Sequence, residues 1–186
     1  PAGTDAEHIA VTNLCLNGHV IYKLSEGKYD DSVISIGANA KLNLYDCDTT
    51  SQHYFKEDED GIGFWIYDNT LTGEQIKHTV YGGLITSEES AGVNIAYKGE
   101  FNMYGGSISG NNLSYNLGSG VNINGGTFNL YNGTISGNYS FDTSGGVGLD
   151  AYIEYIDENN SNIYPGLFNM YGGKIEYNTG NGVLSS

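Results

Sequence analysis

Apolar and polar residues alternate in three nearly identical stretches of this chain. They read FNMYGGSISGN from Phe101, FNLYNGTISGN from Phe128 and FNMYGGKIEYN from Phe168. Each stretch has the two-residue period of a strand, and a Gly or Asn turn divides it into two short strands. A third strand-like segment, GVNI from Gly92 or Gly120 and GVGL from Gly146, precedes the next copy. One unit is therefore expected to contain three short strands.

Weaker copies of the unit lie upstream, in LCLNGH, KLNLYDC and HTVYGG. Aligned copies then start at positions 14, 42, 78, 101, 128 and 168, which predicts about six irregular coils. Equivalent strands recur one full unit apart and are not mirrored, so stacked units should pair in parallel. The predicted fold is all-β, a right-handed parallel β-helix with three short parallel sheets. The density of Gly and Asn argues against a helical solenoid.

The alternation also predicts which side chains point inward. The expected interior columns are Leu14, Leu42, Phe101, Phe128 and Phe168, beside Leu16, Leu44, Val80, Met103, Leu130 and Met170. The expected outward residues are Asn43, Asn102, Asn129 and Asn169, with Tyr45, Tyr81, Tyr104, Tyr131 and Tyr171. Neighbouring rungs lie about 4.8 Å apart, so aligned Tyr rings can stack and aligned Asn amides can hydrogen-bond.

Charge narrows the range of partners. The chain has 22 acidic residues against 7 lysines and no arginine, a formal net charge of −15. Such a surface repels nucleic acid and anionic membranes, and no apolar run is long enough to span a bilayer. We therefore expect no nucleic-acid partner and no membrane insertion. Neutral glycans, basic proteins and metal cations remain suitable partners.

The repeated FNMYGGSISGN units, with LCLNGH and LYDC before them, resemble the right-handed β-helix repeat regions of large surface and secreted proteins of Gram-positive gut anaerobes. The resemblance covers about residues 14–183. It implies a stalk, adhesin or ligand-binding module, located at the bacterial cell surface or secreted. The expectation is one domain over residues 1–186, a fragment of a larger protein, with residues 1–13 as its N-terminal cap region. The last stretch, GVLSS, opens another unit, so end-to-end self-association is also expected.

Two insertions interrupt the repeat, at residues 46–77 and 150–166. The first contains the only tryptophan, Trp65, followed by Tyr67, and the second contains Tyr152 and Tyr155. Solenoids commonly place specificity on projecting loops, so these four residues are candidate ligand-binding residues. Whether the two insertions share one rim of the solenoid is left open.

The outward Tyr column, with Tyr104, Tyr131 and Tyr171, is a further candidate binding surface. Its rings could stack on sugar faces or serve as anchors for a host protein. Alternatively, the column is structural, since Tyr favours strands and covers the sheet.

Carboxylates cluster in the first insertion. Asp46, Asp48, Asp58 and Asp60 are candidate Ca²⁺ ligands, because Ca²⁺ takes several oxygen ligands. Their spacing does not match an EF-hand, and a solvated acidic loop is the alternative. No other cofactor is expected.

No catalytic motif accompanies the repeat. Arginine is absent, the four histidines form no recognisable triad with Ser and Asp, and the carboxylates lie in loops. The sequence therefore predicts a non-catalytic module that recognises a glycan or a host protein. A rigid spacer and a polysaccharide-active, lyase-like enzyme are the alternatives.

The two cysteines are expected to be free. In the repeat alignment Cys15 takes the position of Asn102 and Cys47 that of Gly106, about four residues further along the strand, or roughly 13 Å. That separation exceeds the reach of a disulfide, so none is predicted between Cys15 and Cys47.

Overall fold

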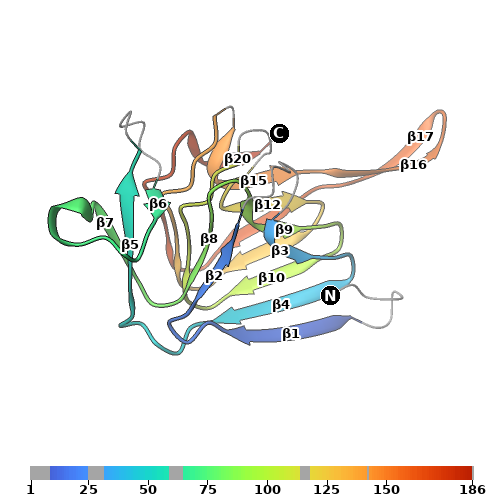
Figure 1. The fold of residues 1–186 in the computed structure, drawn as a ribbon. Helices are drawn as coiled ribbons and strands as arrows, with labels where there is room; N and C mark the ends of the chain where they lie inside the picture. Colours follow the sequence, from blue (N-terminus) through green and yellow to red (C-terminus); the bar gives the residue numbers. More distant parts are fainter. Residues whose placement is uncertain (1–8, 25–31, 59–64, 114–117, 142, 186) are drawn as a thin grey trace.

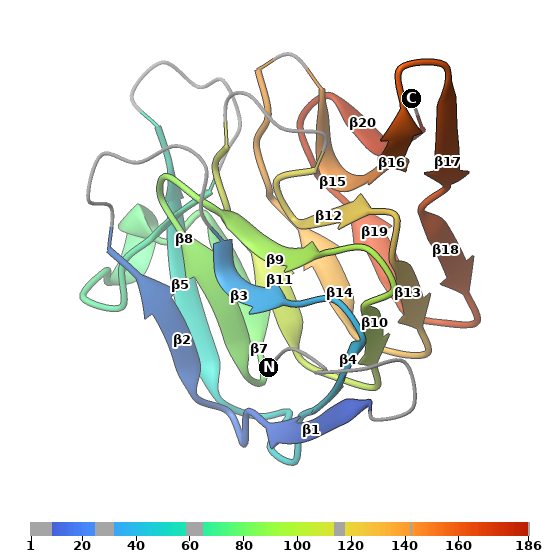
Figure 2. The ribbon, with the colours of Figure 1, turned by 90° about the vertical axis from the view of Figure 1, so that its right-hand side faces the viewer.

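The chain forms a parallel β-helix in the computed structural model, which describes residues 9–24, 32–58, 65–113, 118–141 and 143–185. Three five-stranded parallel sheets surround one interior (Figures 1 and 2). Sheet 1 has the order β1 (Ala10–Cys15), β4 (Ala40–Tyr45), β10 (Glu100–Met103), β13 (Thr127–Leu130) and β18 (Leu167–Met170). Sheet 2 has the order β2 (Val20–Lys23), β8 (Leu84–Ser87), β11 (Ser107–Ser109), β14 (Thr134–Ser136) and β19 (Lys174–Glu176). Sheet 3 has the order β3 (Ser32–Ile36), β9 (Ala91–Ile95), β12 (Val121–Asn124), β15 (Ser144–Asp150) and β20 (Asn181–Ser185).

The interior is a set of side-chain columns, as the alternation predicts. Phe101, Phe128 and Phe168 pair in register along sheet 1, and their rings stack at 5.0 and 5.2 Å between centroids. An isoleucine column fills sheet 2: Ile21, Ile85, Ile108, Ile135 and Ile175. The middle rungs are fully buried because each has a neighbour above and below.

The prediction of six coils is wrong, because the copy placed at position 78 is not a coil. Each of the three sheets has five strands. β7 (His78–Tyr81) pairs antiparallel with β5 (Gln52–Glu57), outside the solenoid. Val80 is therefore absent from the main interior, and Tyr81 is absent from the Tyr column. The sequence HTVYGG resembles the repeat because an edge strand alternates apolar and polar residues in the same way as a strand of the solenoid.

The alignment of the first coil is also shifted by two residues. Leu14 pairs with Leu44, and Thr12 pairs with Leu42. A two-residue shift keeps every side chain on the predicted face, because the strand period is two. Alternation alone therefore could not detect it. Of the predicted cap region, residues 1–8 lie outside the described residues, and Ala10–Asn13 belong to β1.

This shift explains why the prediction of free cysteines is wrong. Cys15 and Cys47 form a disulfide with a Cα–Cα distance of 6.4 Å. In the true register Cys15 pairs with Tyr45, only two residues before Cys47. The bond ties the first coil to the beginning of the first insertion.

Three asparagines, two of them fully buried, stabilise the corner that follows sheet 2. Asn111, Asn138 and Asn178 are one rung apart, and the amide of each earlier residue donates to the Oδ1 of the next at 2.9 Å. The same oxygens accept the backbone N–H groups of Asn111 and Asn138, and the amides also reach carbonyls of neighbouring rungs, such as Ile85 and Ile108. The repeated SGN sequence therefore supplies the corner with hydrogen-bond partners that a buried turn needs.

The two insertions leave the solenoid at different corners and extend to opposite sides in Figure 1. The first lies between β4 and β8, at the turn from sheet 1 to sheet 2. It forms the insertion sheet, with order β6 (Trp65–Tyr67), β5 and β7, and the short 3-10 helix η1 (Gly73–Gln75). The second lies between β15 and β18, at the turn from sheet 3 to sheet 1, and is the hairpin β16 (Tyr152–Asp157) and β17 (Asn160–Tyr164). The two insertions therefore do not share a rim.

Candidate functional site

The insertion sheet packs on the outer face of sheet 2 through a small core of its own. Phe55, Trp65, Val80 and Leu84 form this cluster, with Leu84 contributed by β8 of the solenoid. The neighbouring rungs of sheet 2 carry small outward residues. Gly110 lies against the Phe55 ring and Gly137 against the Trp65 ring, both in left-handed backbone conformations, with φ of +69° and +61°. A Cβ at either position would overlap these aromatic atoms. Gly110 and Gly137 therefore form the surface on which the insertion sheet packs, here called the seat of the insertion sheet.

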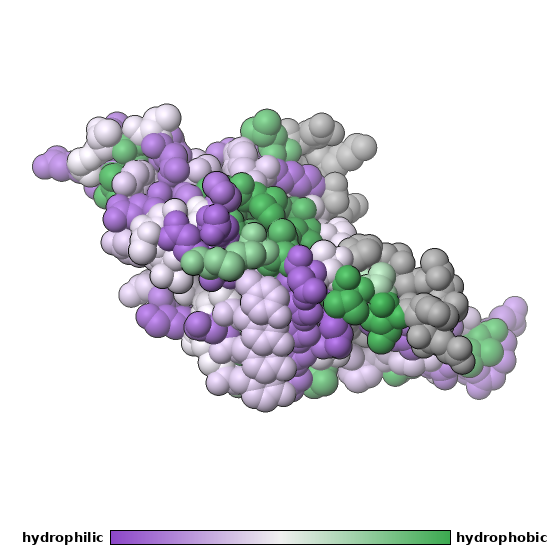
Figure 3. All heavy atoms as spheres, turned by 90° about the horizontal axis from the view of Figure 1, so that it is seen from below, coloured by the Kyte–Doolittle hydropathy of each residue, from purple (hydrophilic) through white to green (hydrophobic). Residues whose placement is uncertain are grey.

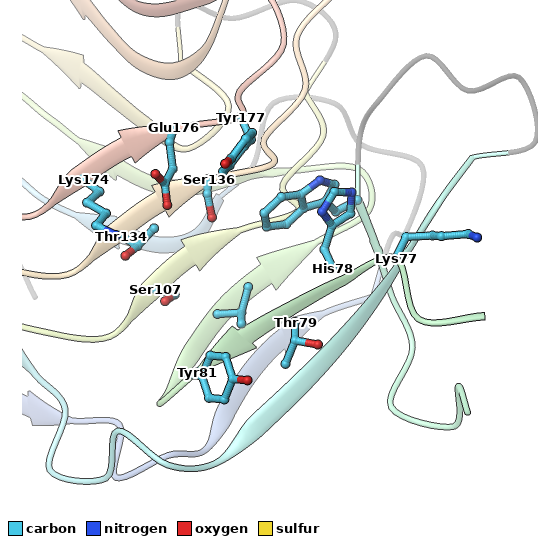
Figure 4. A pocket seen from close by; sticks show the side chains of 12 residues that line it. Lys77, His78, Thr79, Tyr81, Ser107, Thr134, Ser136, Lys174, Glu176 and Tyr177 are labelled. Atoms are coloured by element: carbon cyan, nitrogen blue, oxygen red, sulfur yellow. The ribbon is translucent and has the colours of Figure 1, made fainter. Parts of the chain in front are cut away.

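A groove of about 460 Å³ runs between the insertion sheet and the exposed part of sheet 2 (Figure 4). Its floor is the outer face of β11, β14 and β19, and its wall is β7. The lining residues are Trp65, Lys77, His78, Thr79, Val80, Tyr81, Ser107, Thr134, Ser136, Lys174, Glu176 and Tyr177. Hydroxyl groups, aromatic rings and charges of both signs therefore converge on one groove. This is the candidate binding site.

Trp65 borders the groove, but most of its contacts are packing contacts within the protein. It is 7% exposed, and its ring stacks on His78 with centroids 4.1 Å apart. His78 in turn contacts Glu57, with Nε2 and Oε1 3.1 Å apart. The Trp ring therefore lies between Gly137 and His78, which leaves its edge toward the groove. The predicted insertion tryptophan does reach the candidate site, as a part of its wall.

Tyr67 does not line the groove. Its ring packs 5.7 Å from the rings of Phe55 and Tyr22 at the outer side of the small core. Burial raises the pKa of Tyr67, because the ionised phenolate is poorly solvated there.

The Tyr column on sheet 1 is regular, with four members. Tyr45, Tyr104, Tyr131 and Tyr171 stack at centroid distances of 4.9, 4.7 and 4.9 Å, with ring planes within 10°. Beside it, the amides of Asn13, Asn43, Asn102, Asn129 and Asn169 hydrogen-bond from rung to rung at 2.8–2.9 Å. Both columns are visible in Figure 3, as a column of rings beside a column of strongly hydrophilic side chains.

This stacking limits what the Tyr column can bind. Each inner ring has another ring against both of its faces, so only ring edges and hydroxyls point to solvent. A sugar that stacks on a ring face would need an end of the column. At one end Tyr171 is 67% exposed and its outer face has no Tyr neighbour in the described residues, whereas at the other end Tyr45 pairs with Cys15. The geometry therefore supports the structural interpretation for Tyr104 and Tyr131.

The hairpin holds the other two aromatic candidates, far from the groove. Tyr152 stacks on Tyr97 at 4.6 Å near the base of the hairpin, whereas Tyr155 is 79% exposed toward its tip. Tyr164, on the opposite strand of the hairpin, packs against the same Tyr97 ring. Its hydrogen bonds with Tyr97 and with Glu154 raise the pKa of Tyr164 to about 12. Tyr152 is therefore part of a packed base, and only Tyr155 is free for contact.

Three of the four candidate Ca²⁺ ligands, Asp46, Asp48 and Asp58, lie in the described part of the chain. Asp46 accepts the backbone N–H groups of Gly18 and Gly83 at 2.9 and 2.7 Å, and so joins the turns of neighbouring coils. Asp48 accepts hydrogen bonds from Thr50 and Ser51, and these bonds lower its pKa. Asp58 follows β5, and Asp60 lies outside the described residues. The described part of the chain contains no group of three or more His, Cys, Asp or Glu residues arranged around a metal position.

The sequence interpretation missed the residues at the end of the groove. In the last copy of the repeat, KIEYN replaces SISGN, so Lys174, Glu176 and Tyr177 stand where earlier copies have Ser or Thr, Ser and Gly. Tyr177 keeps the left-handed conformation of the glycine it replaces, with φ of 56°, and is 72% exposed. The signal was present as departures from the repeat at Lys174 and Glu176, on one face of β19, and at Tyr177 directly after this strand.

Comparisons with other proteins add no identification. The chain matches no family model, and it matches neither curated proteins nor solved structures. Among the described residues, no helix has the length and apolar character needed to cross a bilayer.

Proposed function

We propose that this chain is a non-catalytic binding module of a bacterial surface or secreted protein, with its ligand in the groove beside β7. The observation that carries the proposal is the convergence of aromatic rings, hydroxyls and charges in one open groove of about 460 Å³. Ligand sites are concave and combine apolar surface with a few polar groups that fix orientation. The ligand that we propose is the one expected from the sequence, a glycan or a host protein.

An extracellular location is part of the proposal. The Cys15–Cys47 disulfide supports it, because disulfides persist mainly in oxidising compartments. The resemblance to surface-protein repeats supports the same location. The predicted end-to-end self-association remains a proposal as well.

Two variants on one coil test the site. Thr134→Trp fills the floor of the groove, whereas Tyr131→Ala removes one ring of the column on sheet 1. Glycan and host-protein arrays probed with the unmodified chain should give a ligand whose binding is lost in Thr134→Trp and kept in Tyr131→Ala. The reverse result would place binding on the Tyr column.

A rigid spacer is the second candidate function. The continuous Asn and Tyr columns favour it, since they stiffen the solenoid without offering a site. Absence of any ligand on the arrays, with both variants folded, would support the spacer. Release of product from acidic or neutral polysaccharides in the presence of Ca²⁺ would instead support the lyase-like alternative.

A further inference from the structure

We infer that the groove accepts an extended polypeptide segment, which adds to the free edge of β7 as a further strand of the insertion sheet. This inference rests on the proposed function and names the class of ligand. β7 is the last strand of the insertion sheet, whose order is β6, β5, β7. One edge of β7 pairs with β5, and the other edge is not paired with any described strand.

The lining of the groove shows that this free edge faces it. Lys77, His78, Thr79, Val80 and Tyr81 all line the groove, five residues in succession. Successive side chains of a strand point to opposite faces. A groove that touched one face of β7 would therefore contact every second residue. Contact with five consecutive residues means that the groove runs along the edge, where the backbone is accessible.

The hydrogen-bond pattern of the insertion sheet identifies the free backbone groups. The N–H of Gly82 donates to the carbonyl of Ser51 on the β5 side, in the same register that pairs Val80 with His53. Backbone groups in an antiparallel strand point alternately to the two sides. Those of His78 and Val80 therefore face β5, and those of Thr79 and Tyr81 face the groove. No hydrogen bond joins the N–H of Thr79 or Tyr81 to a described residue outside the insertion sheet.

An open edge of this kind fits a polypeptide better than a glycan. A strand added to β7 would lie about 4.8 Å away and would pair its own alternating N–H and C=O groups with those of Thr79 and Tyr81. Glycans carry hydroxyls without this alternation. The added strand would lie over β14 and β19, the floor of the groove.

Charges on the floor define the preferred segment. Lys174 and Glu176 are two residues apart on β19, so they share its outer face about 6.6 Å apart along the strand. Neither side chain forms an ion pair or hydrogen bond with another described residue. A segment with an acidic residue and a basic residue two positions apart would pair with both. Elsewhere the molecule is strongly acidic, which disfavours a second copy of the chain as occupant.

Tyr177 lies at the end of this floor, in place of the repeat glycine. Its ring centroid is 6.2 Å from that of Trp65 across the groove end. A non-glycine residue in the left-handed region is uncommon, and strain of this kind is concentrated at functional sites. The geometry gives Tyr177 the role of an exposed aromatic contact for one side chain of the added strand.

Removal of one backbone donor tests strand addition directly. A display library of short linear peptides, screened against the whole chain, should yield binders that compete for the groove. Thr79→Pro removes an N–H that faces the groove, and proline is tolerated on strand edges. Thr79→Val keeps the N–H and serves as the matched control. We expect Thr79→Pro to weaken peptide binding about tenfold or more and Thr79→Val to preserve it.

The peptide backbone gives a second measurement. In a selected peptide, N-methylation of every second amide should abolish binding in one register and leave it nearly unchanged in the other, because alternate amides face β7. Equal effects in both registers, or equal binding by Thr79→Pro and Thr79→Val with the insertion sheet intact by circular dichroism, would overturn the inference.

Tyr177→Gly separates binding from a structural role. The variant restores the repeat residue and relieves the left-handed strain, so the melting temperature should stay the same or rise while peptide affinity falls about tenfold. A lower melting temperature with unchanged affinity would assign Tyr177 a structural role and contradict its part in binding.

Failure of this inference is distinguishable from failure of the proposed function. Glycan binding that Thr134→Trp abolishes, with no peptide binder, would overturn strand addition and leave the binding module standing. A dimer that Thr79→Pro dissociates, seen by light scattering, would make a second copy the occupant and would overturn the assignment to another protein. Absence of any glycan, host-protein or peptide ligand for the folded chain would overturn both.

Discussion

The outer faces of sheet 1 and sheet 2 come from the same eleven-residue repeat and differ in what they offer to a partner. On sheet 1 every outward Asn amide and inner Tyr ring meets its counterpart one rung away. On sheet 2 the outward positions of β11 and β14 are Ser107, Ser109, Thr134 and Ser136, which are too small to cover the strands. That face is instead covered in part by the insertion sheet, and the uncovered remainder is the floor of the groove.

The difference shows that, on this solenoid, the more regular outer face is the one with fewer groups left to bind a partner. Identical residues in register satisfy one another, so their polar groups and ring faces are already occupied. Small residues leave room for an inserted segment, and the last rung then replaces them with Lys174, Glu176 and Tyr177. A candidate site therefore arises where the repeat changes.

The seat of the insertion sheet should be the most sensitive position on either face. Gly137→Ala should lower the free energy of unfolding by about 2–5 kcal/mol, from left-handed strain of about 1–2 kcal/mol and overpacking of about 1–3 kcal/mol. Gly73→Ala is the control, since Gly73 has φ of +57° and no atom within 4 Å of an added Cβ. It should lose only about 1–2 kcal/mol. Urea unfolding measures both, and equal losses would contradict the seating role of Gly137.

The disulfide, which ties the first coil to the beginning of the first insertion, should rank next. Replacing both Cys15 and Cys47 by Ser opens a link across 32 residues. The expected loss is about 2–4 kcal/mol. Amide hydrogen exchange should locate the loss in β1 and β5 and leave β13 protected, because contacts in a solenoid are mainly between adjacent coils. A loss spread evenly over all coils would contradict this local coupling.

The Asn column on sheet 1 should give a smaller effect. Asn102→Ala removes the bonds with both Asn43 and Asn129 and leaves partly buried amide groups unpaired, at about 1–2 kcal/mol. Asn13→Ala, at the exposed end of the column, removes one bond and should lose less than about 1 kcal/mol. Thermal unfolding of the two variants measures the difference, and a greater loss for Asn13→Ala would refute the account of the column.

The Tyr column should give the smallest effect, seen as a pH dependence. Burial, and then the neighbouring Tyr131 and Tyr45 hydroxyls, raise the pKa of Tyr104 above its usual 10.0. The folded protein thus favours the neutral phenol. The associated stability is fully present below pH 10 and declines as pH rises through the higher folded pKa. Tyrosinate absorbance should show one fewer late-titrating group in Tyr104→Phe. Ionisation of Tyr104 at or below pH 10 would be the contrary result.

The parts of the fold that depend on alternation could be predicted from sequence. Phe101, Phe128 and Phe168 are inward, Asn102 and Asn129 are outward, and the isoleucines fill sheet 2, because each rung repeats the same local pattern. The register of the first coil could not be predicted in this way, because the two-residue shift at Leu14 keeps every side chain on the same face of the strand. The shift also brings Cys15 and Cys47, expected about 13 Å apart, close enough to form a disulfide. HTVYGG was assigned to a coil because an edge strand has the same alternation.

The candidate site could be predicted only in part. Trp65 was identified because it is the single tryptophan in an insertion, and it does reach the groove. Tyr67 packs into the small core, and Tyr152 and Tyr155 lie on a hairpin at another corner. Tyr177 was not predicted, because it lies within the last copy of the repeat and not in an insertion.

By itself the sequence determined the class of fold, its interior columns and its self-pairing outer columns, because stacking in register makes every rung the neighbour of a near copy. Tertiary structure alone decided the disulfide, the corners from which the insertions leave, and the groove. The groove lies between β7 of the insertion and β14 and β19 of the solenoid, strands that no local sequence pattern connects. Their proximity depends on how the insertion packs on glycines more than fifty positions away in the chain.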